Sequence, residues 1–162
     1  HPFLQFLDQH KRAIDSLCRP FARGNADDMA DLRQEVVMRL WANWATFRHE
    51  SKPITWMWRV AYSAAIDWWR REHRHNPKPT LSDIAATESD DPRALLEELL
   101  ATLAPNEHSL MRLFLDGWSQ AEIAQMLNTT EPAVTSRIYR IKLKLKKAAA
   151  DSAHPSTHKQ SQ

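Results

Sequence analysis

Apolar residues recur every three or four positions along most of the chain, which is the spacing of amphipathic helices. This spacing predicts helical stretches at residues 3–21, 27–45, 55–73, 92–103 and 110–114, and two more within 118–147. In the second stretch, Leu32, Val36, Leu40 and Trp44 form the predicted buried stripe, which Trp41 widens. No alternation of polar and apolar residues is long enough to indicate a strand. The pattern therefore predicts an all-α fold.

A polar segment divides these stretches into two groups. Residues 77–92 begin and end with proline and hold four acidic side chains against one basic one. Such a composition is typical of a flexible tether. We therefore predict two small helical domains, 1–76 and 93–150, joined by a flexible acidic linker, 77–92. The tail 151–162 is too polar to bury a core, and we expect it to be disordered.

The C-terminal domain carries the signals of a helix-turn-helix. Ser119 and Glu122 have the spacing of a capping box, in which each side chain bonds the other residue's backbone N–H. Asn128 tolerates the left-handed conformation of a turn, and Thr130 is placed to cap a second helix. Val134, Ile138, Ile141 and Leu145 would form the buried stripe of that helix. Two short helices capped in this way indicate a DNA-binding unit whose second helix enters the major groove.

Polar and basic side chains occupy the other faces of that second helix. Six positive residues and no negative one lie between Arg137 and Lys147. Arginine can pair with guanine edges, whereas hydroxyls and lysines suit phosphates. A solvated basic helix end would explain the lysines alone. With the capped helix pair in front, we favour DNA contact by Thr135, Ser136, Arg137, Tyr139, Arg140 and Lys142.

Aromatic and basic residues alternate in the stretch 55–73. Trp56, Trp58, Tyr62, Trp68 and Trp69 are interleaved with arginines. Rings flanked by cations could stack on single-stranded bases. The spacing of Trp58, Tyr62 and Trp69 is also that of a buried stripe, and for the rings themselves we favour this second interpretation.

Three motifs resemble one protein family. Residues 28–41 resemble the D-x-x-D-L-x-Q-E-x-x-x-R-L-W signature of sigma region two, and residues 55–61 and 65–71 resemble its promoter-melting helix. Residues 118–140 resemble region four. The ordered pair with a short linker resembles the extracytoplasmic-function (ECF) group of bacterial RNA polymerase sigma factors. The resemblance implies transcription initiation, with no enzymatic activity and no cofactor or metal.

The resemblance also implies roles for individual residues. Asp31, Gln34, Glu35 and Arg39 would dock on the β′ clamp helices of core RNA polymerase. The minus-ten element would be bound by Arg48, Ser51, Lys52, Trp56, Arg59, Ser63, Asp67, Arg70 and Arg71. The minus-35 element would be read by the six residues named above on the last helix. The β flap and an anti-sigma factor would be further partners, and the free chain would be a cytoplasmic monomer without membrane insertion.

Two other classes of protein are weighed against this hypothesis. A helix-turn-helix regulator with an N-terminal ligand or dimerisation domain would explain residues 93–150 equally well, but gives no reason for the motif at 28–41. A metal-dependent nuclease using His49, Glu50, His73 and His75 has poor ligand spacing, because two residues two apart on a helix face different sides. Cys18, the only cysteine, is expected to be a small buried side chain and not a nucleophile.

Overall fold

The computed structural model describes residues 1–74 and 91–153, and its regular elements within these ranges are all helical. This confirms the predicted all-α class. Residues 77–90 of the predicted linker and residues 154–162 of the predicted tail lie outside the described ranges. The last helix continues to Ala153, so the predicted boundary at residue 150 is too early.

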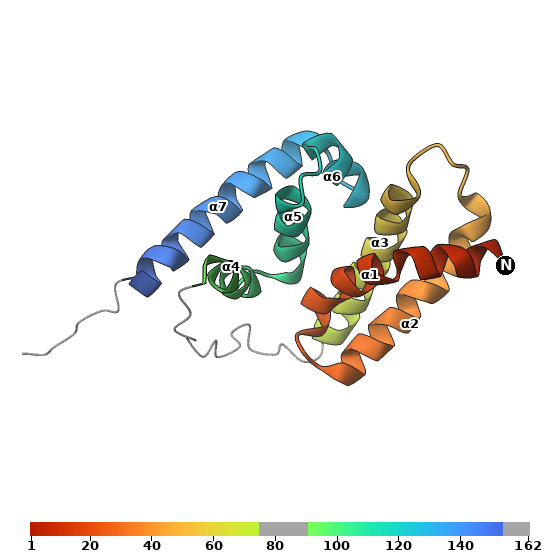
Figure 1. Cartoon of the computed structure of the whole chain (residues 1–162), viewed down its shortest axis with the longest axis horizontal. Coiled ribbons are helices and arrows are strands. Elements are labelled where there is room, and N and C mark those ends of the chain that lie inside the picture. Colours follow the sequence, from red (N-terminus) through yellow and green to blue (C-terminus); the bar gives the residue numbers. More distant parts are fainter. Residues whose placement is uncertain (75–90, 154–162) are drawn as a thin grey trace, which may run out of the picture.

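The first helical group consists of α1 (Pro2–Ala22), α2 (Ala26–Asn43) and α3 (Pro53–Arg74), with a 3₁₀ turn, η1 (Trp44–Thr46), after α2 (Figure 1). Arg23 ends α1 in a left-handed conformation, with φ of 51°. The side chain of Asn25 then starts α2 by accepting a hydrogen bond of 3.0 Å from the backbone N–H of Asp28. The predicted break at Arg23-Gly24-Asn25 is therefore a helix end followed directly by a helix cap.

The start of α3 differs from the prediction. The helix begins at Pro53, two residues before the predicted start at Thr55, so Thr55 lies inside the first turn. A proline fits the first turn of a helix because its missing N–H would have no partner there. Thr55 is buried, which the sequence pattern alone did not indicate.

The core of the first group is rich in aromatic rings. Trp56, Trp58, Tyr62 and Trp68 of α3 are all buried, whereas Trp69 is half-buried. The ring of Trp56 packs at 4.9 Å from that of Phe47, between centroids. These contacts support the core interpretation of the aromatic stripe.

The second helical group consists of α4 (Pro92–Ala101), α5 (Pro105–Leu115), α6 (Gln120–Met126) and α7 (Glu131–Ala153). Pro105 is the first residue of α5, so this helix begins five residues before the predicted stretch 110–114. The preceding helix stops earlier, at Ala101. A proline between two helical stretches is compatible with either position, because it terminates one helix and fits the first turn of the next.

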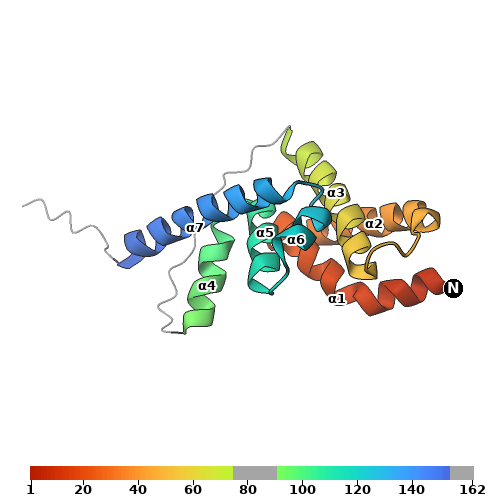
Figure 2. The same ribbon diagram turned by 90° about the horizontal axis from the view of Figure 1, so that it is seen from above.

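The two helical groups pack against each other. The short helix α6 lies against α3, and α5 lies against α1, while α7 extends away from the first group towards its C-terminal end (Figures 1 and 2). Buried residues of both groups belong to one cluster. Tertiary packing therefore brings the predicted helix-turn-helix onto the predicted promoter-melting helix.

The single cysteine lies in the interior of α1. Cys18 is fully buried, and this burial raises the pKa of its thiol to about 12.

We expect the thiol of the folded chain to be unreactive towards Ellman's reagent at pH 8 and to react at once in denaturant. The folded state holds the thiol proton to a higher pH than the unfolded state does. The free energy of unfolding is therefore unaffected by this group below about pH 9, and it decreases as the pH rises from there towards 12. Rapid labelling of the folded protein would contradict the burial.

Candidate nucleic-acid interface

The helix-turn-helix forms through the predicted caps. The Ser119 hydroxyl accepts a bond of 3.1 Å from the Glu122 N–H, and the Glu122 carboxylate accepts one of 3.1 Å from the Ser119 N–H. Asn128 takes a φ of 54° in the turn, and the Thr130 hydroxyl accepts a bond of 3.3 Å from the Ala133 N–H at the start of α7. The predicted unit is confirmed, and the buried residues of its second helix are Val134, Ile138 and Ile141, with Leu145 partly buried.

The predicted minus-35 residues lie on two different faces of α7. Ser136 and Tyr139 are exposed, and 65% of the surface of Tyr139 is accessible to solvent. Thr135 donates a hydrogen bond to the side chain of Gln120 on α6, and Lys142 lies 4.8 Å above the Phe114 ring. Arg137 and Arg140 instead border hollows that Tyr62 of the first group also lines.

Three of the predicted minus-ten residues share one face of α3. Arg59, Ser63 and Asp67 follow each other at intervals of four residues, and Arg70 continues this face one turn later. In the loop before α3, Arg48 and Lys52 are exposed and Ser51 is half-buried. Trp56 is different, because only 7% of its surface is accessible. Its ring packs against Phe6, Trp44 and Phe47 and does not offer a face for stacking.

Helix α6 lies across the first part of this α3 face. The Asn128 amide donates a hydrogen bond of 3.1 Å to the Arg59 carbonyl, and Arg59 Nε donates one of 3.4 Å to the Gln125 carbonyl. Lys52 Nζ lies 3.2 Å from a Glu122 carboxylate oxygen. The bonds from Ser119 and Lys52 lower the pKa of Glu122. We call the three interactions Asn128–Arg59, Arg59–Gln125 and Lys52–Glu122 the closed contacts.

Two residues of the closed contacts are also among those that the family resemblance assigns to DNA. Lys52 and Arg59, two predicted minus-ten cations, are in contact with the helix-turn-helix and not with solvent alone. The sequence did not reveal this pairing, because the residues lie 66 to 70 positions apart in the chain.

A second set of interactions joins α2 to α3. Asp31 accepts a hydrogen bond of 2.9 Å from Trp68 Nε1, Arg39 lies 2.6 Å from Asp67, and Glu35 pairs with Arg71. We call these three interactions the α2–α3 ladder. Three of the four residues assigned to polymerase docking are thus part of the ladder and hold the two helices together. The fourth, Gln34, is exposed.

Three large apolar side chains on α1 and α2 are exposed, which the sequence pattern did not indicate. Leu4 is 64% exposed, Met38 62% and Trp41 55%. The prediction that Trp41 widens the buried stripe is therefore wrong: its ring lies over the start of α1, 5.0 Å from the ring of Phe3. Exposed apolar groups that gather on one surface are typical of protein-binding sites. We call this the α1–α2 face.

The residues considered for metal binding lie apart. His73 stacks on Trp69 with 3.4 Å between ring centroids, and His49 packs on Phe47 at 4.3 Å. His75 lies outside the described residues. Within residues 1–74 and 91–153, no group of three or more His, Cys, Asp or Glu could hold a metal ion, and no helix there is long and apolar enough to cross a membrane.

Comparison with known proteins assigns each helical group to a known protein region. The family model for sigma-70 region 2 matches residues 6–75, and that for sigma-70 region 4 matches residues 93–145. The ECF RNA polymerase sigma factor SigM of Mycobacterium tuberculosis is 24% identical over 150 residues, which cover 90% of this chain and 76% of SigM. The RNA polymerase sigma-E factor of Streptomyces coelicolor is 29% identical over 152 residues, covering 88% and 85% of the two chains.

A solved structure shares the fold. The sigma factor RpoE of Bartonella quintana, in complex with the anti-sigma factor NepR, superposes with a TM-score of 0.68 at 18% identity, over 90% of this chain and 95% of that one. The helical fold and the two regions in this order define an alternative transcription initiation factor. The chain belongs to the ECF group of RNA polymerase sigma factors, and the hypothesis of a simple helix-turn-helix regulator is not favoured.

Proposed function

We propose that this sigma factor binds core RNA polymerase through the first helical group and directs it to promoters whose minus-ten and minus-35 elements are bound by α3 and α7. The observation that carries the proposal is the match to regions 2 and 4, in that order, on helices whose outer faces bear the expected cations. Each region supplies one DNA-binding face, and neither face needs catalytic chemistry.

Polymerase docking is assigned to α2 together with the α1–α2 face. Gln34 is exposed, and the apolar side chains of Met38 and Trp41 follow it along the same helix. An amide beside exposed apolar groups suits a partner helix that buries them on binding, because such anchors supply much of the affinity of protein interfaces. Asp31, Glu35 and Arg39 would then keep α2 in place through the ladder. The β′ clamp helices are the expected partner here, and the β flap that of the second helical group.

Retention of core RNA polymerase on the immobilised chain tests this assignment. Gln34→Ala combined with Glu35→Ala is expected to weaken binding at least tenfold, since each removes a polar group from the docking helix. Gln34→Ala alone is the cleaner variant, because Gln34 takes no part in the ladder. Gln9→Ala, on the exposed surface of α1, is the matched control and is expected to bind like wild type.

The outcome separates two levels of the proposal. Failure of the wild-type chain to retain core polymerase would refute the proposed activity itself. Wild-type binding that Gln34→Ala leaves unchanged would refute only the docking face. Loss of binding in Glu35→Ala but not in Gln34→Ala would show that the ion pair between Glu35 and Arg71, and hence the ladder, is what polymerase binding requires.

Promoter binding is proposed to require separation of the closed contacts. In the closed arrangement, Lys52 and Arg59 face α6. A DNA strand on α3 would have to displace them. The closed contacts are one exposed ion pair and two single hydrogen bonds, each of which is weak in contact with water. Polymerase docking could therefore open them by binding the two helical groups separately.

An anti-sigma factor is a further proposed partner. The structural neighbour from Bartonella quintana was solved with the anti-sigma factor NepR. A partner of this kind would act on the present chain by covering the polymerase-docking face or by favouring the closed arrangement. Co-purification of the chain with a partner that releases it on addition of core polymerase would support this proposal.

A further inference from the structure

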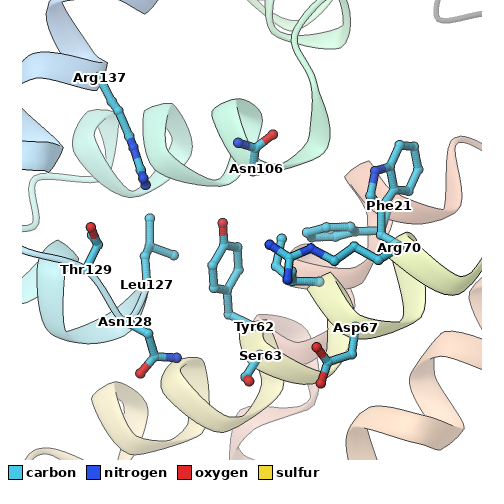
Figure 3. A pocket seen from close by; sticks show the side chains of 12 residues that line it. Phe21, Tyr62, Ser63, Asp67, Arg70, Asn106, Leu127, Asn128, Thr129 and Arg137 are labelled. Carbon is cyan, nitrogen blue, oxygen red and sulfur yellow. The ribbon is translucent and has the colours of Figure 1, made fainter. Parts of the chain in front are cut away.

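A cavity lies between the two helical groups, beside the closed contacts (Figure 3). Its volume is about 550 Å³, which is within the range of roughly 300–1,000 Å³ found for small-molecule sites. Residues of α1 and α3 form one wall, and residues of α5, α7 and the turn after α6 form the other. We call it the α3–α7 cavity.

Two arginines from opposite walls converge in this cavity. Arg70 extends from α3 and Arg137 from α7, and the hydroxyl of Tyr62 lies between them (Figure 3). Burial raises the pKa of Tyr62, while the positive charges of Arg137 and Arg70 lower it. Among the residues that the structure describes, no ion pair or hydrogen bond involves the side chain of Arg70, Arg137 or Tyr62.

The remaining lining is mostly uncharged and able to form hydrogen bonds. Asp67 is the single acidic group in the lining, and its carboxylate is already paired with Arg39 at 2.6 Å. Ser63, Asn128 and Thr129 add hydroxyl and amide groups. Because the Asp67 carboxylate is already paired, the two arginines give the cavity an excess of positive charge. Like charges that converge without a partner are unfavourable, so an anion that bridged them would stabilise the arrangement.

We propose that the α3–α7 cavity is a binding site for a phosphorylated small molecule, whose phosphate group lies between Arg70 and Arg137. Guanidinium groups present paired donors that match the oxygens of a phosphate, and the Tyr62 hydroxyl can add a third donor. The side-chain amides and hydroxyls would bind the polar remainder of the molecule. Because each arginine belongs to a different helical group, the ligand would favour the closed arrangement over the open one.

The binding assay uses the full chain alone, without DNA or polymerase. Inorganic pyrophosphate and ATP are the two probes, each titrated by calorimetry at low ionic strength. Saturable binding with one site per chain is expected for at least one of them. Arg70→Gln and Arg137→Gln are each expected to weaken that affinity at least tenfold, because each removes half of the phosphate clamp. Lys146→Gln removes the same charge from α7 away from the cavity and is expected to bind like wild type.

A second measurement tests the bridge. Hydrogen exchange with and without the bound probe is expected to slow in α3 and in the α6–α7 turn together, since the ligand touches both. Arg137→Lys keeps the charge but loses the planar pair of donors, and it is expected to bind more weakly than wild type. The circular dichroism of every variant is compared with that of wild type to establish that the helices are retained.

Three results would overturn the proposal. The first is the absence of saturable binding of either probe up to about 10 mM, a concentration at which even a weak site would be occupied. The second is equal weakening by Lys146→Gln, which would indicate general attraction of anions to α7. The third is protection of α7 without α3. None of these results bears on polymerase binding or promoter recognition, so the proposed function is tested separately.

Discussion

A crosslink between positions 52 and 122 is expected to abolish promoter-dependent transcription, and its cleavage is expected to restore it. In Lys52→Cys/Glu122→Cys, the two new thiols replace an ion pair of 3.2 Å between the loop before α3 and the first turn of α6. A short bismaleimide with a central disulfide can span them. The crosslinked chain would keep α6 over the α3 face, so that a DNA strand could not reach Arg59. Run-off transcription with core polymerase measures the effect before and after reductant.

The design contains its own control. The cleaved protein carries the same two substitutions and the same modified thiols, so any effect of losing Lys52 or the Glu122 cap is present in both samples. Cys18 does not compete for the reagent, because it is buried. Full transcription by the crosslinked chain would show that initiation does not require separation of the closed contacts. Absence of activity after cleavage would instead trace the loss to the substitutions.

Truncation of Trp68 is expected to be the most destabilising single change in the first helical group. Trp68 is almost completely buried and donates a hydrogen bond of 2.9 Å to Asp31. Trp68→Ala would leave a large cavity in the core, at a cost of about 3–5 kcal/mol in the free energy of unfolding. That is a large part of the total stability of a small domain, which is about 5–15 kcal/mol. Urea denaturation followed by circular dichroism measures the change.

A conservative substitution separates the hydrogen bond from the packing. Trp68→Phe keeps most of the apolar contact but removes the N–H donor, and we expect a loss of about 1–3 kcal/mol. Trp41→Ala is the matched control, because this indole is 55% exposed and its removal should change stability by less than about 1 kcal/mol. A loss for Trp41→Ala as large as that for Trp68→Ala would contradict the exposed position of Trp41.

The Trp68 series also bears on how Asp31 acts. If Trp68→Phe weakened polymerase retention while the chain stayed folded, Asp31 would be a positioning residue that holds α2 through the ladder. Retention at the wild-type level would mean that Asp31 can dock without its indole partner. The same distinction applies to Glu35 and Arg39, whose partners are Arg71 and Asp67.

Local sequence signals predicted the helix-turn-helix well. The capping box of Ser119 and Glu122, the left-handed Asn128 and the cap at Thr130 all formed as expected. Each of these features depends on residues within about four positions of one another. Such short-range geometry is set by the backbone and by the side chain's own chemistry, so it can be derived from the sequence.

Predictions that depended on which face of a helix is covered were less successful. Trp41 has the spacing of a core residue but is exposed, whereas Trp56 is buried as the apolar stripe predicted. Periodicity shows that a helix has an apolar stripe, but the width of the buried part depends on the neighbouring helices. Here α1 and the 3₁₀ turn after α2 decide which rings are covered.

The helical class, the order of the two regions and the caps of the helix-turn-helix can therefore be derived from the amino-acid sequence, because they rest on local patterns and on contacts between near neighbours in the chain. Only the tertiary structure decided that Asp31, Glu35 and Arg39 join α2 to α3, that Lys52 and Arg59 face α6, and that Arg70 and Arg137 meet across a cavity. These residues lie about 28 to 70 positions apart in the chain, and packing of the helices is what brings them together.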